Sequence, residues 1–295
     1  MRSLLERVKD GEILVADGAM GTMLMDHGLK PGTPPESFNL MHLEVLEEIA
    51  RLYLDAGADI IQTNTFGASP LRLSLSSLDH KAEEINKNAV LAARKAAKDR
   101  AYVAASCGPS GRLLKPYGDT DPEEIYDSFA RQMKALISAG VDAICIETMT
   151  DLKEATLAIK AAKTVSSITP VMAAMTFDPT PRGFYTVMGT SIKFAAKALK
   201  EAGADIIGSN CGNGIENMLK IAREFKKQSK LPIIIQSNAG IPEMQGDKPT
   251  WPETPEFMAK KAKELVSLGV SIIGGCCGTT PEHVRAIRKI VGLRK

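Results

Sequence analysis

The sequence shows no excess of charge of either sign and no long apolar run. Its 295 residues include 37 Lys and Arg against 35 Asp and Glu, which gives a formal net charge of +2. These charges are dispersed along the chain, which argues against a nucleic-acid-binding surface. No window approaches the roughly 18 consecutive apolar residues of a membrane-spanning helix. We therefore expect neither a nucleic-acid partner nor a membrane segment.

The chain also lacks the features of an exported, disulfide-bonded protein. Its first residues, MRSLLERVKDGE, are charged and amphipathic and contain no apolar signal core. The cysteines number five, an odd count, and the adjacent pair Cys276 and Cys277 can bridge only through a strained ring. We expect a soluble, cytoplasmic protein with reduced thiols. Cys276 and Cys277 are then either buried structural thiols or ligands of a soft metal.

Eight short apolar runs recur along the chain, and each is typical of a buried parallel strand. They begin at Ile13, Asp59, Tyr102, Ala143, Pro170, Asp205, Ile233 and Ser271. Helical stretches with a 3.6-residue period separate them, and four helix-to-strand junctions place a glycine where a helix C-cap needs one: Gly57, Gly140, Gly203 and Gly269. Eight such units predict a single-domain (β/α)₈ TIM barrel of the α/β class over residues 1–295. A doubly wound sheet is the alternative, although no G-x-G-x-x-G follows the first run.

Polar side chains end nearly every apolar run, and the C-terminal ends of barrel strands are where active sites lie. These residues are Asp17 and Gly18; Gln62, Thr63 and Asn64; Ser106 and Cys107; Glu147 and Thr148; Thr176 and Asp178; Asn210 and Cys211; Ser237 and Asn238; Cys276 and Cys277. We expect them to line the mouth of the barrel. Cys107 and Cys145 are expected to be structural.

Three of these positions are thiols on the sixth and eighth runs: Cys211, Cys276 and Cys277. One strand separates the two runs, about 10 Å in all, so thiolates that bind zinc at about 2.3 Å can meet there. Cys276 and Cys277 can face one ion only if the strand breaks, which neighbouring glycines permit: Gly274, Gly275 and Gly278. Zinc on three thiolates has one open position, which Asn238 is placed to fill weakly. Alternatively, the cysteines are small buried hydrophobes.

A zinc ion on three thiolates would carry a net charge of about −1. It is therefore a poor Lewis acid for splitting water, but it can bind a further thiol, lower the pKa of that thiol and leave its sulfur nucleophilic. The chemistry predicted for such a site is alkyl transfer to sulfur.

Five motifs resemble the homocysteine S-methyltransferase family, most closely the homocysteine-binding barrel of cobalamin-dependent methionine synthases. They are DGAMGT (17–22), QTNTF (62–66), IETM (146–149), GSNCGNG (208–214) and GGCCGTTPEH (274–283), and the resemblance covers essentially the whole chain. It implies methyl transfer to the thiol of homocysteine, giving methionine, with Zn²⁺ bound by Cys211, Cys276 and Cys277.

The resemblance also implies a site for the amino acid part of homocysteine. Asp17 and Glu147 correspond to the acidic residues that hold the amino group, and an ammonium in a barrel mouth does favour carboxylates. Backbone N–H groups of the turn that starts at Gly18 can receive the substrate carboxylate. Asp17 is alternatively a loop cap. The turn after Cys211, GNGIENM, departs from the family pattern, and it either suits a different donor or partner or is simply flexible.

The methyl donor is the part that the motifs leave open. The chain has room for the barrel only, ends 18 residues after Cys277, and contains no D-x-H-x-x-G cobalamin signature. We therefore expect a methylated corrinoid protein as partner, which supplies methylcobalamin in trans. The alternatives are a self-contained enzyme that uses S-methylmethionine, an enzyme that uses betaine, and a non-catalytic zinc barrel that acts as a scaffold. Betaine needs an aromatic cage, and the chain has one Trp and five Tyr.

Three long strand-end loops, 106–121, 177–190 and 238–251, have the composition of a docking surface for such a partner. They carry aromatic residues that we expect to be exposed: Tyr117, Phe184, Tyr185 and Trp251. The alternative is that the loops only cover the homocysteine site.

Overall fold

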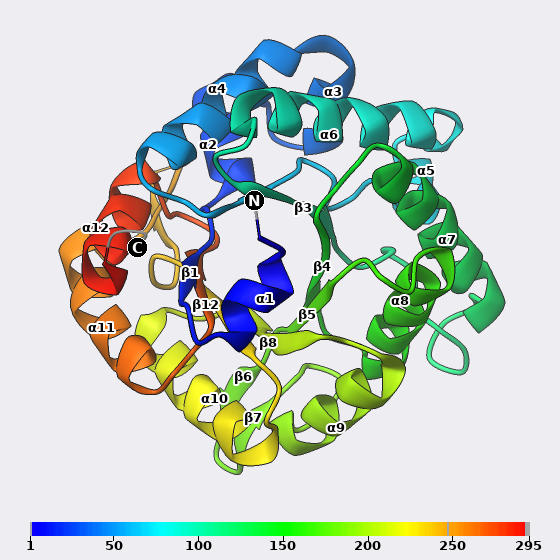
Figure 1. Cartoon of the computed structure of the whole chain (residues 1–295). Coiled ribbons are helices and arrows are strands. Elements are labelled where there is room, and N and C mark those ends of the chain that lie inside the picture. The colour runs from blue at the N-terminus through cyan, green and yellow to red at the C-terminus, as the bar shows by residue number, and fades with distance from the viewer. Residues whose placement is uncertain (1, 247, 293–295) are drawn as a thin grey trace.

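The computed structural model describes residues 2–246 and 248–292. Within these residues, eight parallel strands form one sheet in the order β1-β12-β9-β8-β5-β4-β3-β2. The strands are β1 (Leu14–Val15), β2 (Ile60–Gln62), β3 (Tyr102–Cys107), β4 (Ala143–Met149), β5 (Val171–Met175), β8 (Ile206–Asn210), β9 (Ile233–Ser237) and β12 (Ile272–Gly275). A parallel bridge from Ala16 to Ile60 joins β1 to β2 and closes the sheet. The predicted barrel is therefore confirmed, and the doubly wound alternative is wrong (Figure 1).

Helices form a layer around the barrel (Figure 1). The long ones are α4 (Leu43–Asp55), α6 (Ala82–Ala97), α7 (Pro122–Ser138), α8 (Leu152–Val165), α9 (Ile192–Ala202), α10 (Ile215–Gln228), α11 (Pro255–Ser267) and α12 (Pro281–Val291). Shorter elements are α1 (Leu4–Lys9), α2 (Met20–Asp26), η1 (Pro35–Ser37), α3 (Phe38–Met41), α5 (Pro70–Ser74) and η2 (Asp79–Lys81). Two hairpins extend from the strand-end loops: β6 (Asp178–Thr180) with β7 (Gly183–Tyr185), and β10 (Glu243–Gln245) with β11 (Lys248–Thr250).

Local sequence signals set the ends of these helices. Asp151 caps α8 by accepting the amide N–H of Lys153 at 2.7 Å, and Ser191 caps α9 by accepting that of Phe194. At the four predicted junctions the glycines take left-handed φ angles of 100°, 93°, 105° and 73° (Gly57, Gly140, Gly203 and Gly269). Because a side chain disfavours this conformation, glycine is the residue that lets each helix turn directly into the next strand.

The interior of the barrel is apolar at the end where the strands begin. Buried side chains from all eight strands meet there, and Leu4 and Val8 of α1 pack against them. Helix α1 therefore lies across this opening and closes it (Figure 1). Cys145 belongs to this cluster, as predicted for a structural thiol, and Cys107 is also fully buried.

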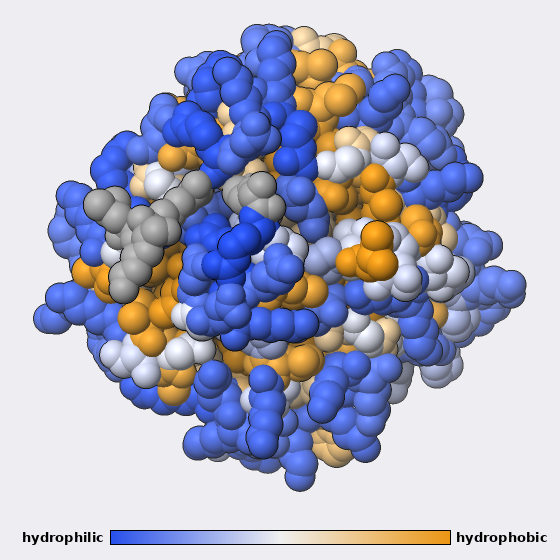
Figure 2. Space-filling view, viewed as in Figure 1, coloured by the Kyte–Doolittle hydropathy of each residue, from blue (hydrophilic) through white to orange (hydrophobic). Residues whose placement is uncertain are grey.

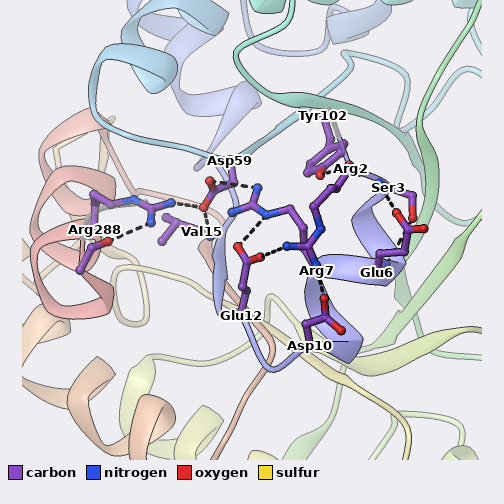
Figure 3. A network of polar contacts seen from close by, with 11 residues as sticks. Arg2, Ser3, Glu6, Arg7, Asp10, Glu12, Val15, Asp59, Tyr102 and Arg288 are labelled. Atoms are coloured by element: carbon purple, nitrogen blue, oxygen red, sulfur yellow. Dashed lines mark hydrogen bonds and ion pairs between the residues drawn. The ribbon is translucent and has the colours of Figure 1, made fainter. Parts of the chain in front are cut away.

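A buried ion cluster fixes α1 and α12 to the closed end (Figure 3). Asp59, fully buried before β2, accepts the backbone N–H of Val15 at 2.9 Å and pairs with Arg288 of α12. Arg7 of α1 lies 3.6 Å from the same carboxylate. A buried carboxylate is tolerated when it is paired in this way. Hydrophilic residues cover the centre of this face (Figure 2). No helix among the described residues is long and apolar enough to cross a bilayer.

Candidate active site

Three thiols converge at the open end of the barrel. Cys211 directly follows β8, Cys276 and Cys277 directly follow β12, and β9 lies between these strands. The Sγ atoms of Cys211 and Cys277 are 3.8 Å apart, and all three sulfurs lie within 4.8 Å of one another. The predicted break in the last strand is present, because β12 ends at Gly275 and a turn closes with the N–H of Thr279 donating to the carbonyl of Cys276 at 3.1 Å.

This arrangement fits a zinc ion. Tetrahedral zinc with Zn–S bonds of about 2.3 Å places its sulfur ligands about 3.8 Å apart, and the donor set of three thiols suits this soft metal. Cys211 has a φ angle of 58°, a left-handed conformation that is uncommon outside glycine. Such conformations persist where neighbouring contacts impose them, often at functional sites.

The three sulfurs lie close enough to influence one another's ionisation. The contacts with Cys276 and Cys277 lower the pKa of Cys211, and the contact with Cys211 raises the pKa of Cys277. The same contacts raise the pKa of Cys276. The three thiols therefore titrate as one coupled group and not independently.

Asp17, at the end of β1, is a buried acid with one unused oxygen. Its Oδ2 accepts the backbone N–H of Gln62 at 2.7 Å. Its Oδ1 is buried and has no hydrogen-bond partner among the described residues. Burial raises the pKa of Asp17 to about 8, and the charge of nearby Glu147 adds to this, against the lowering effect of the Gln62 amide.

Glu147, on β4, is the second buried acid. Its Oε1 accepts the hydroxyl of Ser106 and Nε2 of Gln62 at 3.1 Å, and its Oε2 accepts Nδ2 of Asn210 at 3.3 Å. Burial raises the pKa of Glu147 to about 7 although these bonds oppose the shift. Within the described residues, no salt bridge reaches Glu147 or Asp17. A cationic ligand group would therefore stabilise both carboxylates.

The polar residues that hold Glu147 were not selected as site residues from the sequence. Asn210 also accepts the backbone N–H of Thr148 at 2.7 Å, at a point where β4 bulges and Thr148 takes a φ angle of 59°. Nε2 of Gln236 donates to Oε1 of Gln62 at 2.8 Å. The sequence places Gln62, Ser106 and Asn210 at strand ends. Their hydrogen bonds to Glu147 depend on which side chains share one layer of the barrel, and only the fold determines that.

Six of the seven predicted site residues line one cavity of about 560 Å³: Asp17, Gly18, Glu147, Cys211, Cys276 and Cys277. Pro34, Glu36, Phe66 and Arg72 line the same cavity. Asn238 does not line it. Instead, Asn238 is buried beside Cys211, where its side chain donates a hydrogen bond that lowers the pKa of the thiol. The Oδ1 atom of Asn238 is buried and has no hydrogen-bond partner among the described residues.

Gly18 is required by close packing. A Cβ atom there would lie 2.6 Å from Oγ1 of Thr279 and 2.9 Å from the ring of Tyr53. The following amide, that of Ala19, donates to the same Thr279 hydroxyl at 3.1 Å, so it is not available to a ligand. Helix α2 begins at Met20 without a side-chain cap. The amides of its first turn are the remaining donors in this stretch.

The three long strand-end loops, 106–121, 177–190 and 238–251, form the rim of the barrel mouth. The exposure of their aromatic residues differs in part from the prediction. Tyr117 is 77% exposed, as expected. Phe184 and Tyr185, in hairpin β6–β7, are half-buried, and Trp251 is half-buried with its ring against Gly278. The expectation that all four aromatics are exposed is therefore wrong for three of them, because Phe184 and Trp251 pack against the hydrophobic core and Arg182 lies over the ring of Tyr185.

Fold and site together define a TIM barrel that presents three clustered thiols and two buried carboxyl groups in one cavity at its open end. The chain belongs to the homocysteine S-methyltransferase family, whose model, "Homocysteine S-methyltransferase", matches residues 14–291. This match confirms the resemblance inferred from the motifs and the assignment of the chain to a family of enzymes.

The chain is similar to two curated methionine synthases. Those of Mycobacterium leprae and Mycobacterium tuberculosis are each 32% identical over 298 residues, which cover 95% of this chain and 24% of theirs. The chain thus spans about a quarter of the length of these relatives. Among solved structures, the homocysteine methyltransferase MmuM from Escherichia coli matches in its metallated form with a TM-score of 0.78 and 22% identity, covering 94% of this chain and 96% of that one. Its apo form matches with a TM-score of 0.74. These matches support the fold.

Proposed function

We propose that this protein transfers a methyl group to the thiol of homocysteine, giving methionine, and that Cys211, Cys276 and Cys277 hold the zinc ion on which this depends. The observation that carries the proposal is that a three-thiol cluster of zinc-binding dimensions shares one cavity with two buried acids that have no cationic partner among the described residues. Family membership points to the same reaction.

When bound, zinc would lower the pKa of the substrate thiol, so that the thiolate is the reacting form at neutral pH. The protein's own contribution is to hold the three cysteines. Nδ2 of Asn210 donates toward Cys276 at 3.9 Å, and the side chain of Asn238 contributes to the lowered pKa of Cys211. Hydrogen bonds of this kind fix the orientation of metal ligands and tune their charge.

Asp17 and Glu147 would bind the substrate ammonium group. The unused Oδ1 of Asp17 is the acceptor that such a cation would satisfy, and the raised pKa values of both acids would fall once a positive charge lies between them. We assign the substrate carboxylate to the turn at Gly18 and the opening amides of α2. A non-catalytic scaffold would have no use for this pair of buried acids.

The donor is proposed to be a methylated corrinoid protein, so that methylcobalamin is used only through this partner. The support is a set of exposed apolar residues on the three rim loops: Leu113, Tyr117, Val187, Met188, Ile241 and Met244. Similarity to one quarter of two methionine synthases agrees with a barrel that works beside other modules. The protein is proposed to act in the cytoplasm, where its thiols stay reduced.

A self-contained enzyme that uses S-methylmethionine is the second candidate. The size of the cavity favours it, since a volume of about 560 Å³ lies in the usual range for small-molecule pockets and exceeds the needs of one small amino acid. Betaine has less support, because Phe66 is the one aromatic residue among the described residues that line the cavity.

The test is a parallel assay on the zinc-loaded protein. Homocysteine is supplied with a methylated corrinoid protein, free methylcobalamin, S-methylmethionine or betaine, and methionine is measured by mass spectrometry. Fastest turnover with the corrinoid protein supports the proposal, whereas rapid turnover with S-methylmethionine alone selects the second candidate. No methionine from any donor, together with no proton release when homocysteine is added, would leave the scaffold as the better description.

A further inference from the structure

One residue outside the cavity connects the two cysteine-bearing turns. Glu253 follows the third rim loop, and its Oε2 accepts the backbone N–H of Ile215, the first residue of α10, at 2.9 Å. Ile215 lies four positions after Cys211 and is fully buried. The carboxylate of Glu253 therefore holds the start of the helix that the Cys211 turn leads into, in the place of a side-chain cap that α10 lacks.

The backbone of the same residue reaches the other turn. The N–H of Glu253 donates to the carbonyl of Ala239 at 3.0 Å, and the N–H of Ala239 donates to the carbonyl of Cys277 at 3.0 Å. Nε2 of His283, in the first turn of α12, lies 2.9 Å from the carbonyl of Glu253. Both segments that carry thiols are thus tied to one short stretch of chain.

Gly214 explains why the turn after Cys211 is rich in glycine. A Cβ atom on Gly214 would overlap the carboxylate of Glu253, with Cδ only 2.7 Å away. Yet the φ and ψ angles of Gly214, −76° and 174°, are open to any residue. Glycine is therefore needed here for space and not for backbone freedom, and the side chain that fills the space is Glu253.

We propose that Glu253 is a positioning residue for the metal-binding thiols, and that Gly214 is present to admit its carboxylate. This inference rests on the proposed zinc site. Cys211 is held at a φ angle of 58°, which the free chain disfavours, so contacts around its turn must impose it. Glu253 supplies one such contact and couples it to the turn of Cys276 and Cys277.

Trp251 strengthens the same connection. Its ring covers Gly278, where a Cβ atom would lie 2.5 Å from Cδ1, directly after Cys277. The stretch from Trp251 to Glu253 therefore packs on one cysteine turn and hydrogen bonds to the other. This gives the third rim loop a role at the metal site that is separate from any role in docking.

The experiment measures zinc affinity by competition with a chromophoric chelator for wild type, Glu253→Ala, Gly214→Ala and the double variant. Loss of an outer partner of metal ligands typically weakens metal binding about 10- to 100-fold, and we expect this of each single variant. Because Gly214→Ala acts only by displacing the carboxylate of Glu253, it should cause no additional loss of zinc affinity when Glu253 is already replaced by Ala. Glu253→Gln keeps an acceptor oxygen of the same reach and should retain near wild-type affinity.

Two further readouts separate positioning from general stability. The Co²⁺-substituted proteins should show altered thiolate-to-metal charge-transfer bands in both single variants and a wild-type band in Glu253→Gln. Glu243→Ala, which removes an exposed carboxylate from the same loop, is the matched control and should match wild type throughout. Melting temperatures of the metal-free proteins show that the variants are folded.

Wild-type zinc affinity in Glu253→Ala would overturn the inference, as would a Gly214→Ala effect of equal size in both backgrounds. Failure of the wild-type protein itself to bind zinc is a different result. It would overturn the proposed function, and this inference with it.

Discussion

Cys211 and Cys277 are 66 positions apart in sequence, and their sulfurs lie 3.8 Å apart in the fold. The barrel produces this contact because β8 and β12 flank β9, so residues that directly follow the two strands reach the same edge of the mouth. Cys211 arrives in a left-handed conformation, and Cys277 arrives after the strand has already turned. Neither thiol would face the other from a regular strand position.

Replacement of a single thiol should remove the metal. We expect Cys277→Ala to lose most of its zinc and its methyl-transfer activity, because two thiolates remain where three fit the ion. Metal content by atomic emission is the measurement. Cys145→Ala is the matched control, since this thiol lies in the closed end of the barrel and should leave one zinc per chain. Full zinc stoichiometry in Cys277→Ala would disprove the assignment of ligands.

Replacement of Glu147 should weaken homocysteine binding and leave zinc in place. One charge-assisted hydrogen bond contributes about 1.5–3 kcal/mol, so Glu147→Gln should bind homocysteine about ten- to a hundredfold more weakly. Calorimetry with homocysteine and with 4-mercaptobutyrate, which lacks the amino group, measures the effect. Wild type should prefer homocysteine, and the variant should treat both ligands alike.

Glu154→Gln provides the comparison for that experiment. Glu154 is also a buried acid, but it accepts hydrogen bonds from Ser110 and does not line the cavity. Its replacement should leave the preference for homocysteine intact. If wild type itself shows no preference for homocysteine over the deaminated ligand, the proposed substrate class is wrong.

The two buried acids should make the ligand-free protein less stable as pH rises. Their folded-state pKa values, about 8 for Asp17 and about 7 for Glu147, lie above the ordinary carboxyl values near 4. Between these limits the native state binds more protons than the unfolded state, so the free energy of unfolding falls with increasing pH. We expect this loss between about pH 4 and pH 8 in chemical denaturation of the metal-free protein. The double variant Asp17→Asn, Glu147→Gln should lose less stability over this range, and an unchanged slope would contradict the pKa assignment.

The sequence predicted those parts of the molecule that depend on periodicity and on local backbone needs. Eight apolar runs became the eight strands, and Gly203 ends α9 in the left-handed conformation that its position required. The cysteine cluster followed from strand order, which the barrel imposes. Asp17 and Glu147 were placed at the mouth by the same rule and lie in the cavity.

The parts that were missed depend on long-range packing. Glu253 reaches Ile215 across 38 positions, and nothing in its Pro-rich surroundings distinguishes it from a solvated charge. Trp251 was expected on the surface because its long loop is rich in Gly and Pro, whereas its ring packs on Gly278. Asn238 follows β9 as predicted, but only the fold shows that it is buried and does not line the cavity.

The proposed partner should dock on the rim, and Tyr117 is the residue that best tests this. Tyr117 is 77% exposed on the loop after β3, and nearby rim loops expose Val187 at 73% and Met244 at 67%. The thiolate of homocysteine and the methyl group would have to lie in line about 3–3.5 Å apart, so a corrinoid protein would have to contact these loops to reach the cavity. Tyr117→Ala should therefore lower kcat/KM for the methylated corrinoid protein several-fold and leave kcat/KM for free methylcobalamin unchanged, because large aromatic side chains are frequent anchors of interfaces.

Two comparisons make the docking experiment decisive. Ile168→Ala removes an 89% exposed apolar side chain from the loop before β5, at the closed end of the barrel, and should affect neither donor. Trp251→Ala should lower both rates together, because its ring supports the turn of Cys277 and not only the rim surface. Equal rates with corrinoid protein and free methylcobalamin in the wild type, unaffected by Tyr117→Ala, would rule out the rim as a docking surface. Rapid turnover with S-methylmethionine in the same preparation would then make the self-contained enzyme the correct description.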